Sequence, residues 1–161
     1  MSTGLGLFHV GFVVRDIRAS MEELSGVLGC SWSDVSEGTM DLRHDGEDIH
    51  PDMKFAFSLG ERGQIELIEQ VPGTVWKLSD GADMEFNHLG YWSEQFVSDS
   101  AGLAARDMPM ICTYATPATV DGFAYHRLPS GLVLELVDTD RKPDFDAWFA
   151  GADFSSPDAA Q

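Results

Sequence analysis

The stretch Phe8-His9-Val10-Gly11-Phe12-Val13-Val14 is an apolar run that carries one imidazole near its start, and it predicts a β-strand. The order His, apolar, Gly, aromatic returns in Asn87-His88-Leu89-Gly90-Tyr91-Trp92, 88 − 9 = 79 residues later. The stretches Ile65-Glu66-Leu67-Ile68-Glu69 and Leu134-Glu135-Leu136-Val137-Asp138 also repeat, at an offset of 135 − 66 = 69 residues. These repeats indicate one supersecondary unit used twice, and such units bury their apolar faces against each other.

Each half therefore carries one His and one Glu in equivalent places, His9 with Glu66 and His88 with Glu135. A lone His in an apolar strand is more often a packed core residue, and a Glu between apolar residues usually lies on the solvent face of a strand. Here both a His and a Glu interrupt the apolar pattern at equivalent places in the two halves, which favours a site shared by the halves. Because imidazole and carboxylate are good ligands for a divalent ion, we predict that the four side chains bind one Zn, Ni, Co, Mn or Fe ion.

The length of 161 residues fits a single domain. The chain has 27 acidic and 10 basic side chains and a formal net charge of −17, which disfavours nucleic acid and anionic membrane surfaces as partners. It contains neither an apolar run of about 18 residues nor a basic segment at its start. We therefore expect a cytoplasmic protein with no membrane partner.

Turn residues and apolar periodicity divide each half into one helix and four strands. In the first half we expect a strand over 6–14, a helix from the N-cap Asp16 to 28, a strand over 30–39 and a hairpin of 53–57 with 64–70. The acidic stretch 41–52 is expected to be a solvated loop or a mobile lid. In the second half we expect strands over 87–95 and 110–114, a helix from about 97, and a hairpin of 123–128 with 132–137.

Four strands and one helix cannot cover both faces of their own sheet, so the two βαβββ modules, about 6–70 and 87–139, should meet and curve around a shared cleft. The predicted fold class is α+β, with a curved, partly open mixed sheet. Residues 71–86 form the linker, with a possible short helical turn around Val75. Residues 140–161 should form a short amphipathic helix from Pro143, which docks on the domain or on a partner subunit, and a tail.

Residues 6–139, with a His in each first strand and a Glu in each last strand, resemble the vicinal oxygen chelate superfamily. This superfamily includes glyoxalase I, methylmalonyl-CoA epimerase, fosfomycin and bleomycin resistance proteins, and extradiol dioxygenases. The stretches His9-Val10-Gly11, Gln64-Ile65-Glu66-Leu67, His88-Leu89-Gly90 and Val133-Leu134-Glu135-Leu136 are similar to the ligand-bearing strands of glyoxalase I and the epimerases. The resemblance implies that His9, Glu66, His88 and Glu135 are the metal ligands, and residues 125–135 look closest to the epimerase branch.

Two features depart from the family pattern. The epimerases pair a metal-bound carboxylate with a second acidic residue before the third strand, and here that neighbourhood offers only Asp52 beside Pro51. The chain also lacks a convincing counterpart of the Arg and Asn residues with which glyoxalase I binds glutathione.

Two imidazoles and two carboxylates leave one or two positions open on a five- or six-coordinate ion. Such an ion acts as a Lewis acid that stabilises an enolate formed beside a carbonyl, and Glu66 or Glu135 is the natural catalytic base. We therefore predict a metal-dependent lyase or isomerase that acts on a small substrate. One alternative is an iron-dependent ring-cleaving dioxygenase, although this chemistry prefers two His and one carboxylate, so that Glu66 argues against it. Another is a metal-free protein that sequesters a hydrophobic ligand.

Trp76, Trp92, Tyr125 and His126 are the candidate substrate-binding residues. The alternative is that they belong to the core, as aromatic side chains at strand positions more often do. We expect a homodimer.

Overall fold

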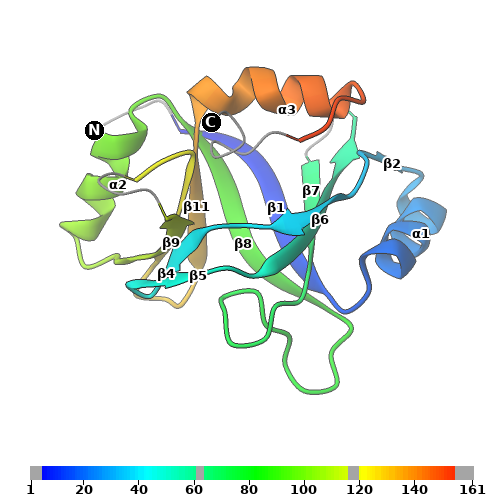
Figure 1. The fold of residues 1–161 in the computed structure, drawn as a ribbon, viewed down its shortest axis with the longest axis horizontal. Helices are drawn as coiled ribbons and strands as arrows, with labels where there is room; N and C mark the ends of the chain where they lie inside the picture. The colour runs from blue at the N-terminus through cyan, green and yellow to red at the C-terminus, as the bar shows by residue number, and fades with distance from the viewer. Residues whose placement is uncertain (1–4, 61–63, 116–119, 155–161) are drawn as a thin grey trace.

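The computed structural model describes residues 5–60, 64–115 and 120–154. The elements of the first half are β1 (Gly6–Val14), α1 (Ile17–Leu28), β2 (Ser31–Trp32), β3 (Ser36–Thr39), β4 (Leu42–His44), β5 (Glu47–Ile49), β6 (Asp52–Leu59) and β7 (Gln64–Glu69). The second half contains β8 (Met84–Ser93), α2 (Phe96–Ala104), β9 (Met110–Tyr114), β10 (Phe123–Arg127) and β11 (Val133–Asp138). The 3₁₀ turn η1 (Thr139–Arg141) and α3 (Lys142–Phe149) follow (Figure 1).

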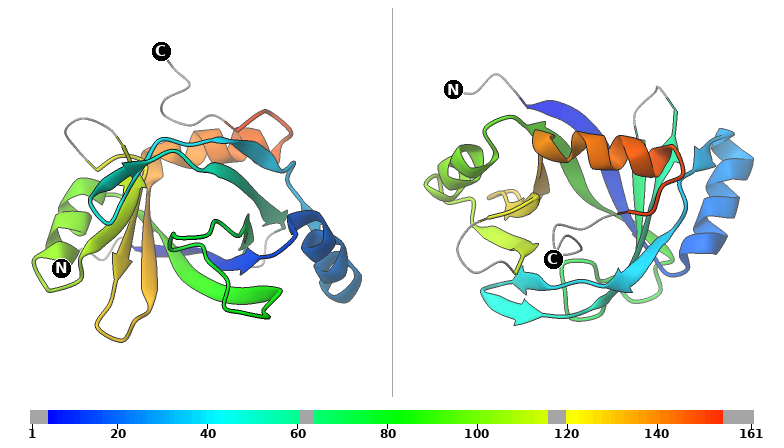
Figure 2. Two further views of the ribbon diagram at one scale, coloured as in Figure 1. Left: turned by 60° about the horizontal axis from the view of Figure 1, so that its bottom comes forward. Right: turned by 45° about the horizontal axis from the view of Figure 1, so that its top comes forward.

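The strands form one mixed sheet in the order β2-β6-β7-β1-β8-β11-β10-β9-β4-β5, with β3 also paired to β6. The two halves meet where β1 pairs antiparallel with β8, and each of these strands pairs in parallel with the last strand of its own half, β7 or β11. The sheet is curved, with α1 and α2 on its outside (Figure 2). The predicted α+β class with a curved, open mixed sheet and a short C-terminal helix is confirmed.

The capping residues at its two ends explain where α1 begins and ends. The side chain of Asp16 accepts a hydrogen bond from the backbone N–H of Ala19 at 3.0 Å, which satisfies a donor that the first turn of a helix leaves unpaired. Gly29 has a φ of 67° and donates its N–H to the carbonyl of Ser25, so it ends the helix in a left-handed conformation.

The stretch 30–52 differs from the prediction of one strand followed by an acidic loop. It contains the short strands β2 and β3, and the expected loop is the β4–β5 hairpin. Met40 N–H donates to the carbonyl of Pro51 at 3.0 Å, so that the pairing of β3 with β6 continues into that of β4 with β5. Asp45 and Gly46 have φ values of 50° and 84°, as the tight turn of a two-residue hairpin requires.

This hairpin also joins the two halves, because β4 pairs with β9. Leu42 turns inward and is fully buried, whereas the ion pair of Arg43 with Asp48 is exposed. The acidic residues that suggested a loop therefore occupy the solvent face of a strand pair, and the reading of this stretch as a solvated loop or lid was wrong.

Residues 71–83 connect β7 to β8 through turns, without the helical turn expected around Val75. β8 begins at Met84, three residues before the predicted start at Asn87. Val71 N–H donates to the carbonyl of Trp76 at 2.8 Å, and this contact holds the connection in a loop that buries the Trp76 indole.

The helix α3 runs along one end of the sheet (Figure 1). Its buried residues, Phe145 and Trp148, pack on the inner face of the sheet, where the Phe145 ring lies 5.2 Å from that of Phe8 and 5.7 Å from that of Phe57. The helix therefore docks on its own domain. The rest of the predicted tail, 155–161, lies outside the described residues. None of the described helices has the length and apolar character needed to cross a bilayer.

Candidate metal centre

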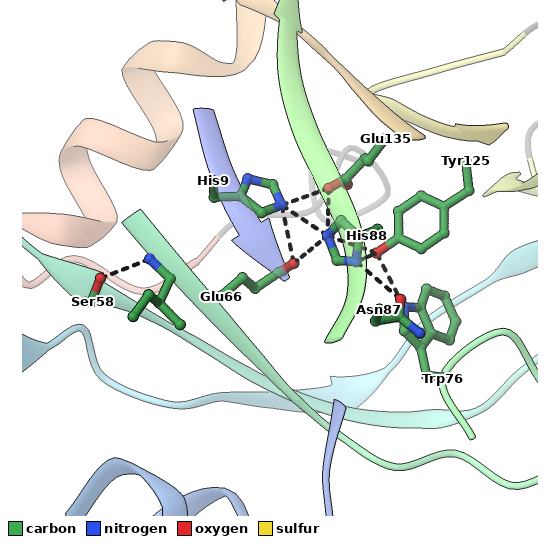
Figure 3. Close-up of polar contacts among 9 residues, drawn as sticks. His9, Ser58, Glu66, Trp76, Asn87, His88, Tyr125 and Glu135 are labelled. Carbon is green, nitrogen blue, oxygen red and sulfur yellow. Dashed lines mark hydrogen bonds and ion pairs between the residues drawn. The ribbon is translucent and has the colours of Figure 1, made fainter. Parts of the chain in front are cut away.

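The four predicted ligands come together on the inner face of the sheet, from four adjacent strands (Figure 3). His9 lies on β1, Glu66 on β7, His88 on β8 and Glu135 on β11. All four are buried, and each offers one ligand atom within 4.8 Å of the others. The sequence repeat thus places two equivalent His–Glu pairs around one point.

Two glycines make this convergence possible. In the sheet register, Gly11 stands between Glu66 and His88, while Gly90 stands between His9 and Glu135. A Cβ on Gly11 would lie 2.0 Å from Cε1 of His88, and one on Gly90 would lie 2.1 Å from Cε1 of His9. Each imidazole therefore occupies the space above the glycine on the neighbouring strand, which explains why the His-apolar-Gly pattern occurs twice.

The donor atoms have the separations expected of ligands around one ion. Nε2 of His9 lies 2.8 Å from Oε2 of Glu135 and 3.3 Å from Oε2 of Glu66. Nε2 of His88 lies 3.0 Å from Oε2 of Glu66 and 3.2 Å from Oε2 of Glu135, and the two Nε2 atoms are 2.9 Å apart. Ligands at about 2.1 Å from a metal and at right angles to each other are roughly 3 Å apart.

The carboxylate oxygens at the centre have the two imidazoles as their polar neighbours. Oε2 of Glu66 and Oε2 of Glu135 are buried and, among the described residues, meet only the Nε2 atoms of His9 and His88 in ion-pair contacts. Buried carboxylate oxygens are normally hydrogen-bonded or coordinated, because their desolvation is otherwise uncompensated. A divalent cation would satisfy both oxygens at once, so the residues present fit a metal of the N/O-ligated kind.

The electrostatics show what the cluster does without metal. Burial lowers the pKa of His9, but the carboxylates of Glu66 and Glu135 outweigh it and raise this pKa to about 9. They likewise raise the pKa of His88 against the effect of burial. Burial raises the pKa of Glu66, but His9 and His88 outweigh it and lower this pKa to about 2. The metal-free site is therefore a buried ion-pair network whose imidazoles hold protons that a metal must displace.

Three residues of the cluster, His9, Glu66 and Glu135, line an apolar cavity of about 60 Å³. Its walls come from β6, β7, β9, β10 and β11, from the connections before β8 and after β11, and from the C-terminal segment. The lining residues are His9, Met40, Met53, Phe55, Phe57, Glu66, Ile68, Trp76, Tyr114, Gly122, Phe123, Tyr125, Glu135, Val137, Arg141, Phe145 and Phe154.

Two of the predicted substrate-binding residues, Trp76 and Tyr125, line this cavity. The indole Nε1–H of Trp76 donates to the hydroxyl of Tyr125 at 3.1 Å, and this hydroxyl lies 3.4 Å from Nδ1 of His88 (Figure 3). Burial and the carboxylates of Glu135 and Glu66 raise the pKa of Tyr125 well above its usual value, so the phenol keeps its proton.

The structure does not bring the other two to the cavity wall. Trp92 stacks on Phe8 at a ring distance of 4.1 Å and packs against Phe145, so it supports the wall from behind. His126 is fully buried, and its two ring nitrogens lie 2.8 Å from the Ser100 hydroxyl and 2.8 Å from the Met108 carbonyl. Because both nitrogens have partners away from the cavity, we leave His126 out of the proposed site.

Sequence reasoning missed part of the wall, and Asp52, the acid that the family pattern brought into question, lies away from it. Phe55 and Phe57 on β6 and Phe145 on α3 were predicted as strand and helix residues but not as cavity walls. The alternating spacing of Phe55 and Phe57 on β6 was the signal that could have placed both side chains on one face of the strand. Asp52 begins β6, is exposed and accepts a hydrogen bond from the Thr39 hydroxyl at 2.6 Å. It does not line the cavity, so Glu66 and Glu135 are the carboxylates among the described lining residues.

A model of the glyoxalase/bleomycin resistance protein/dioxygenase superfamily matches residues 8–125. The chain belongs to this superfamily. The match confirms the predicted family, and it includes His9, Glu66 and His88, whereas Glu135 lies beyond its end. No curated protein sequence matches the chain.

Solved structures with the same fold include methylmalonyl-CoA epimerases. The enzyme from Mycobacterium tuberculosis is 20% identical, with 86% of this chain and 91% of that chain covered and a TM-score of 0.57. A variant of the Streptomyces coelicolor enzyme, in complex with 2-nitronate-propionyl-CoA, is 13% identical, with 82% and 95% covered and a TM-score of 0.56. A hypothetical protein from Bacillus halodurans is 19% identical, with 84% and 94% covered and a TM-score of 0.55. At these identities the likeness shows the fold alone.

We predict that Gly11→Ala and Gly90→Ala each displace an imidazole, because the added methyl would overlap the ring at 2.0 or 2.1 Å. Overpacking of this kind costs about 1–3 kcal/mol of unfolding free energy, and metal affinity should fall with it. Denaturant unfolding and calorimetric titration with Zn²⁺ measure the two effects. Gly26→Ala is the control, since nothing lies within 4 Å of the added Cβ and alanine favours the α1 helix by up to about 1 kcal/mol. Unchanged zinc affinity in both Gly11→Ala and Gly90→Ala would contradict this account of the site.

We also predict opposite pH trends for the metal-free and metal-loaded protein. Folding raises the pKa of His9 from 6.5 to about 9, so its stabilisation is complete below pH 6.5 and is lost as pH rises through 9. Folding lowers the pKa of Glu66 from 4.5 to about 2, so its contribution is present above pH 4.5 and is lost as pH falls through 2. The melting temperature with chelator should therefore fall by roughly 5–10 °C between pH 6.5 and 9.

With metal the trend over the same range reverses, because binding requires deprotonated imidazoles and gains about tenfold in affinity for each pH unit and proton displaced. Thermal unfolding with EDTA and with Mn²⁺ at pH 6.5, 7.5 and 8.5 compares the two states. If the melting temperature changes with pH in the same way in EDTA and in Mn²⁺, no proton is exchanged for metal at this site.

Proposed function

We propose that the protein is a divalent-metal-dependent lyase or isomerase that removes a proton next to the carbonyl of a small substrate. The observation that supports this most directly is the pair of buried carboxylate oxygens that meet two imidazole nitrogens at 2.8–3.3 Å beside an apolar cavity. Membership of the superfamily and a fold shared with methylmalonyl-CoA epimerases are consistent with this chemistry.

His9, Glu66, His88 and Glu135 would hold the metal, which supplies a Lewis acid for the negative charge that develops on the substrate oxygen. The carboxylate of Glu135 or Glu66 would take the proton, because these are the carboxylates among the described residues that line the cavity. We assign no base outside the ligand set, since Asp52 lies at the surface.

Tyr125 is suited to orient the substrate. Its oxygen accepts from Trp76 Nε1–H, and its high pKa keeps the hydroxyl proton in place. That proton can be donated to a polar atom in the cavity, which the surrounding side chains otherwise line with apolar groups. Trp76 and Tyr125 would thereby place a substrate oxygen near the four ligands.

The cavity favours a compact substrate. A volume of about 60 Å³ holds roughly four to six water molecules, and Phe145 on α3 and Phe154 form part of its wall. Its walls are mainly aromatic and aliphatic, with Arg141 as a cationic side chain near the end of η1. The net charge of −17 opposes the approach of a polyanion such as a coenzyme A thioester. We therefore favour a small carbonyl compound with an apolar substituent.

The apolar lining equally suits a binding protein that sequesters a hydrophobic ligand without metal, and this is the second candidate function. The metal content of protein purified without added metal separates the candidates. A redox-inactive ion in stoichiometric amount supports the proposal, stoichiometric iron with oxygen uptake supports a dioxygenase, and a site that stays empty when Zn²⁺, Mn²⁺, Co²⁺ or Ni²⁺ is offered supports the binding protein.

We predict that Glu135→Gln keeps metal but slows exchange of a substrate α-proton with deuterated water by about two to four orders of magnitude, because the amide retains an oxygen donor and loses basicity. His88→Ala should lose metal and exchange together. Proton NMR follows the exchange in small α-hydroxy carbonyls, thiol adducts of 2-oxoaldehydes and methylmalonyl-CoA. Glu69→Gln is the matched control, because Glu69 lies on β7 with Glu66 but pairs with Lys54 at 2.9 Å outside the cavity. Full exchange by Glu135→Gln would move the role of base to Glu66.

We further propose a homodimer formed through the outer face of the central strands. Leu7 on β1 and Phe86 on β8 are 59% and 48% exposed there, and the Phe86 ring contacts Phe12 on the same face. Light scattering after gel filtration should give twice the chain mass of 17.6 kDa. Phe86→Asp should shift the protein to the monomer mass without loss of zinc binding. A monomeric parent protein would contradict this proposal.

A further inference from the structure

The ladder between β1 and β8 contains two β-bulges, one on each side of the metal cluster. Its register shifts between Leu7 and His9, where Phe8 is the extra residue, and again between Gly11 and Phe12, where Asn87 is the extra residue of β8. A bulge places an additional side chain on the face of its neighbour. Phe8 and Asn87 therefore point to the inner face together with His9 and His88, and in the sequence repeat the two bulge residues occupy equivalent positions.

Asn87 uses both ends of its amide. Nδ2 donates to the carbonyl of Val75 at 2.8 Å, and a carbonyl can only accept, so the amide orientation is fixed. Oδ1 then faces Nδ1 of His88 at 3.0 Å (Figure 3). Because Oδ1 can only accept, Nδ1 of His88 must carry a hydrogen, and in the neutral ring the lone pair is on Nε2, which faces Glu66 and Glu135.

The equivalent residue Phe8 offers no hydrogen bond to His9. Its ring meets the imidazole edge-on at a centroid distance of 4.5 Å and an interplanar angle of 84°. Nδ1 of His9 is buried and, among the described residues, has no hydrogen-bond partner. Packing against Phe8 and Phe57 holds this ring in place, but neither contact selects which nitrogen carries the hydrogen.

We propose that Asn87 is a positioning residue that fixes the orientation and the protonated nitrogen of His88, whereas the Nδ1 side of His9, the equivalent residue in the repeat, is held by packing without a hydrogen bond. The inference rests on the proposed metal site. Asn87 is itself held by a longer chain of hydrogen bonds. The N–H of Val75 donates to Nε2 of His44 at 3.0 Å, and the carbonyl of Val75 accepts from Asn87. These contacts link the β4–β5 hairpin and the 71–83 connection to Asn87 and, through it, to His88.

The repeat supplies matched variants. Asn87→Leu removes both hydrogen bonds at similar side-chain size, and Asn87→Asp restores an acceptor for His88 but not the donor to Val75. Phe8→Leu alters packing at the equivalent bulge and removes no hydrogen bond. Loss of an outer partner of a ligating imidazole lowers metal affinity about 10- to 100-fold, so this loss is expected for Asn87→Leu, with Asn87→Asp and Phe8→Leu within about threefold of the parent protein.

Two measurements test the proposal. Calorimetric titration with Zn²⁺ against a competing chelator gives the affinities. Proton NMR of ¹⁵N-labelled protein, with and without Zn²⁺, observes the Nδ1–H of His88, which should exchange slowly with water in the parent, Asn87→Asp and Phe8→Leu proteins and be lost to fast exchange in Asn87→Leu.

The outcomes separate this inference from the proposed function. A parent protein that binds no Zn²⁺ contradicts the metal-dependent function, while the NMR signal in metal-free protein still tests Asn87. An Asn87→Leu protein that keeps the protected His88 Nδ1–H and parental zinc affinity overturns the positioning role. An equal affinity loss in Phe8→Leu also overturns it, because the effect would then come from packing at either bulge.

Discussion

The arrangement of the site depends on a steric constraint between two antiparallel strands, where each imidazole lies over a glycine of the partner strand. His88 fills the space above Gly11, and His9 fills the space above Gly90. With that space free, the Nε2 atoms approach to 2.9 Å, and the side chains of the flanking strands can reach them from both sides. Any other residue at either glycine would push a ring away from the point where the four groups meet.

The same constraint has an energetic consequence. Four ionisable groups buried within one cluster are costly unless their charges compensate, and removal of one partner leaves the others uncompensated. Without metal, protonated imidazoles compensate the two carboxylates, as the raised pKa of His9 and the lowered pKa of Glu66 indicate. A metal would replace those protons as the positive charge that compensates both carboxylates. The fold can thus hold the cluster with or without metal, but the stability of the metal-free and metal-loaded proteins is expected to change with pH in opposite directions.

The fold and the clustering of His9, Glu66, His88 and Glu135 could be predicted because each leaves a periodic signal in the sequence. A His and a Glu that interrupt apolar strands at the same place in both halves are visible without coordinates. The β4–β5 hairpin was missed because its alternation is carried by few apolar residues, chiefly Leu42 and Ile49, among acidic neighbours. The two β-bulges are even harder to predict, because one inserted residue changes the face of the sheet to which its neighbours point without changing the amino-acid composition. The placement of His126 depends on α2, whose packing against β10 no local pattern encodes.

The two halves are related by a repeat, yet the cavity is not symmetric about it. Glu66 is flanked across the sheet by Phe57, whereas Glu135 is flanked by Tyr125, so that the two carboxylates face walls of different polarity. A reaction that inverts a carbon centre needs proton transfer on two faces, and the carboxylates of the described cavity lining are these two ligands. Inversion would therefore require both Glu66 and Glu135 to move protons, while isomerisation or elimination on one face would require one of them. Tyr125 is the cross-strand neighbour of Glu135, and its hydroxyl lies 3.4 Å from Nδ1 of His88. A substrate oxygen bound by Tyr125 would therefore lie on the side of the cavity formed by β10 and β11, which favours Glu135 as the base in a one-face reaction.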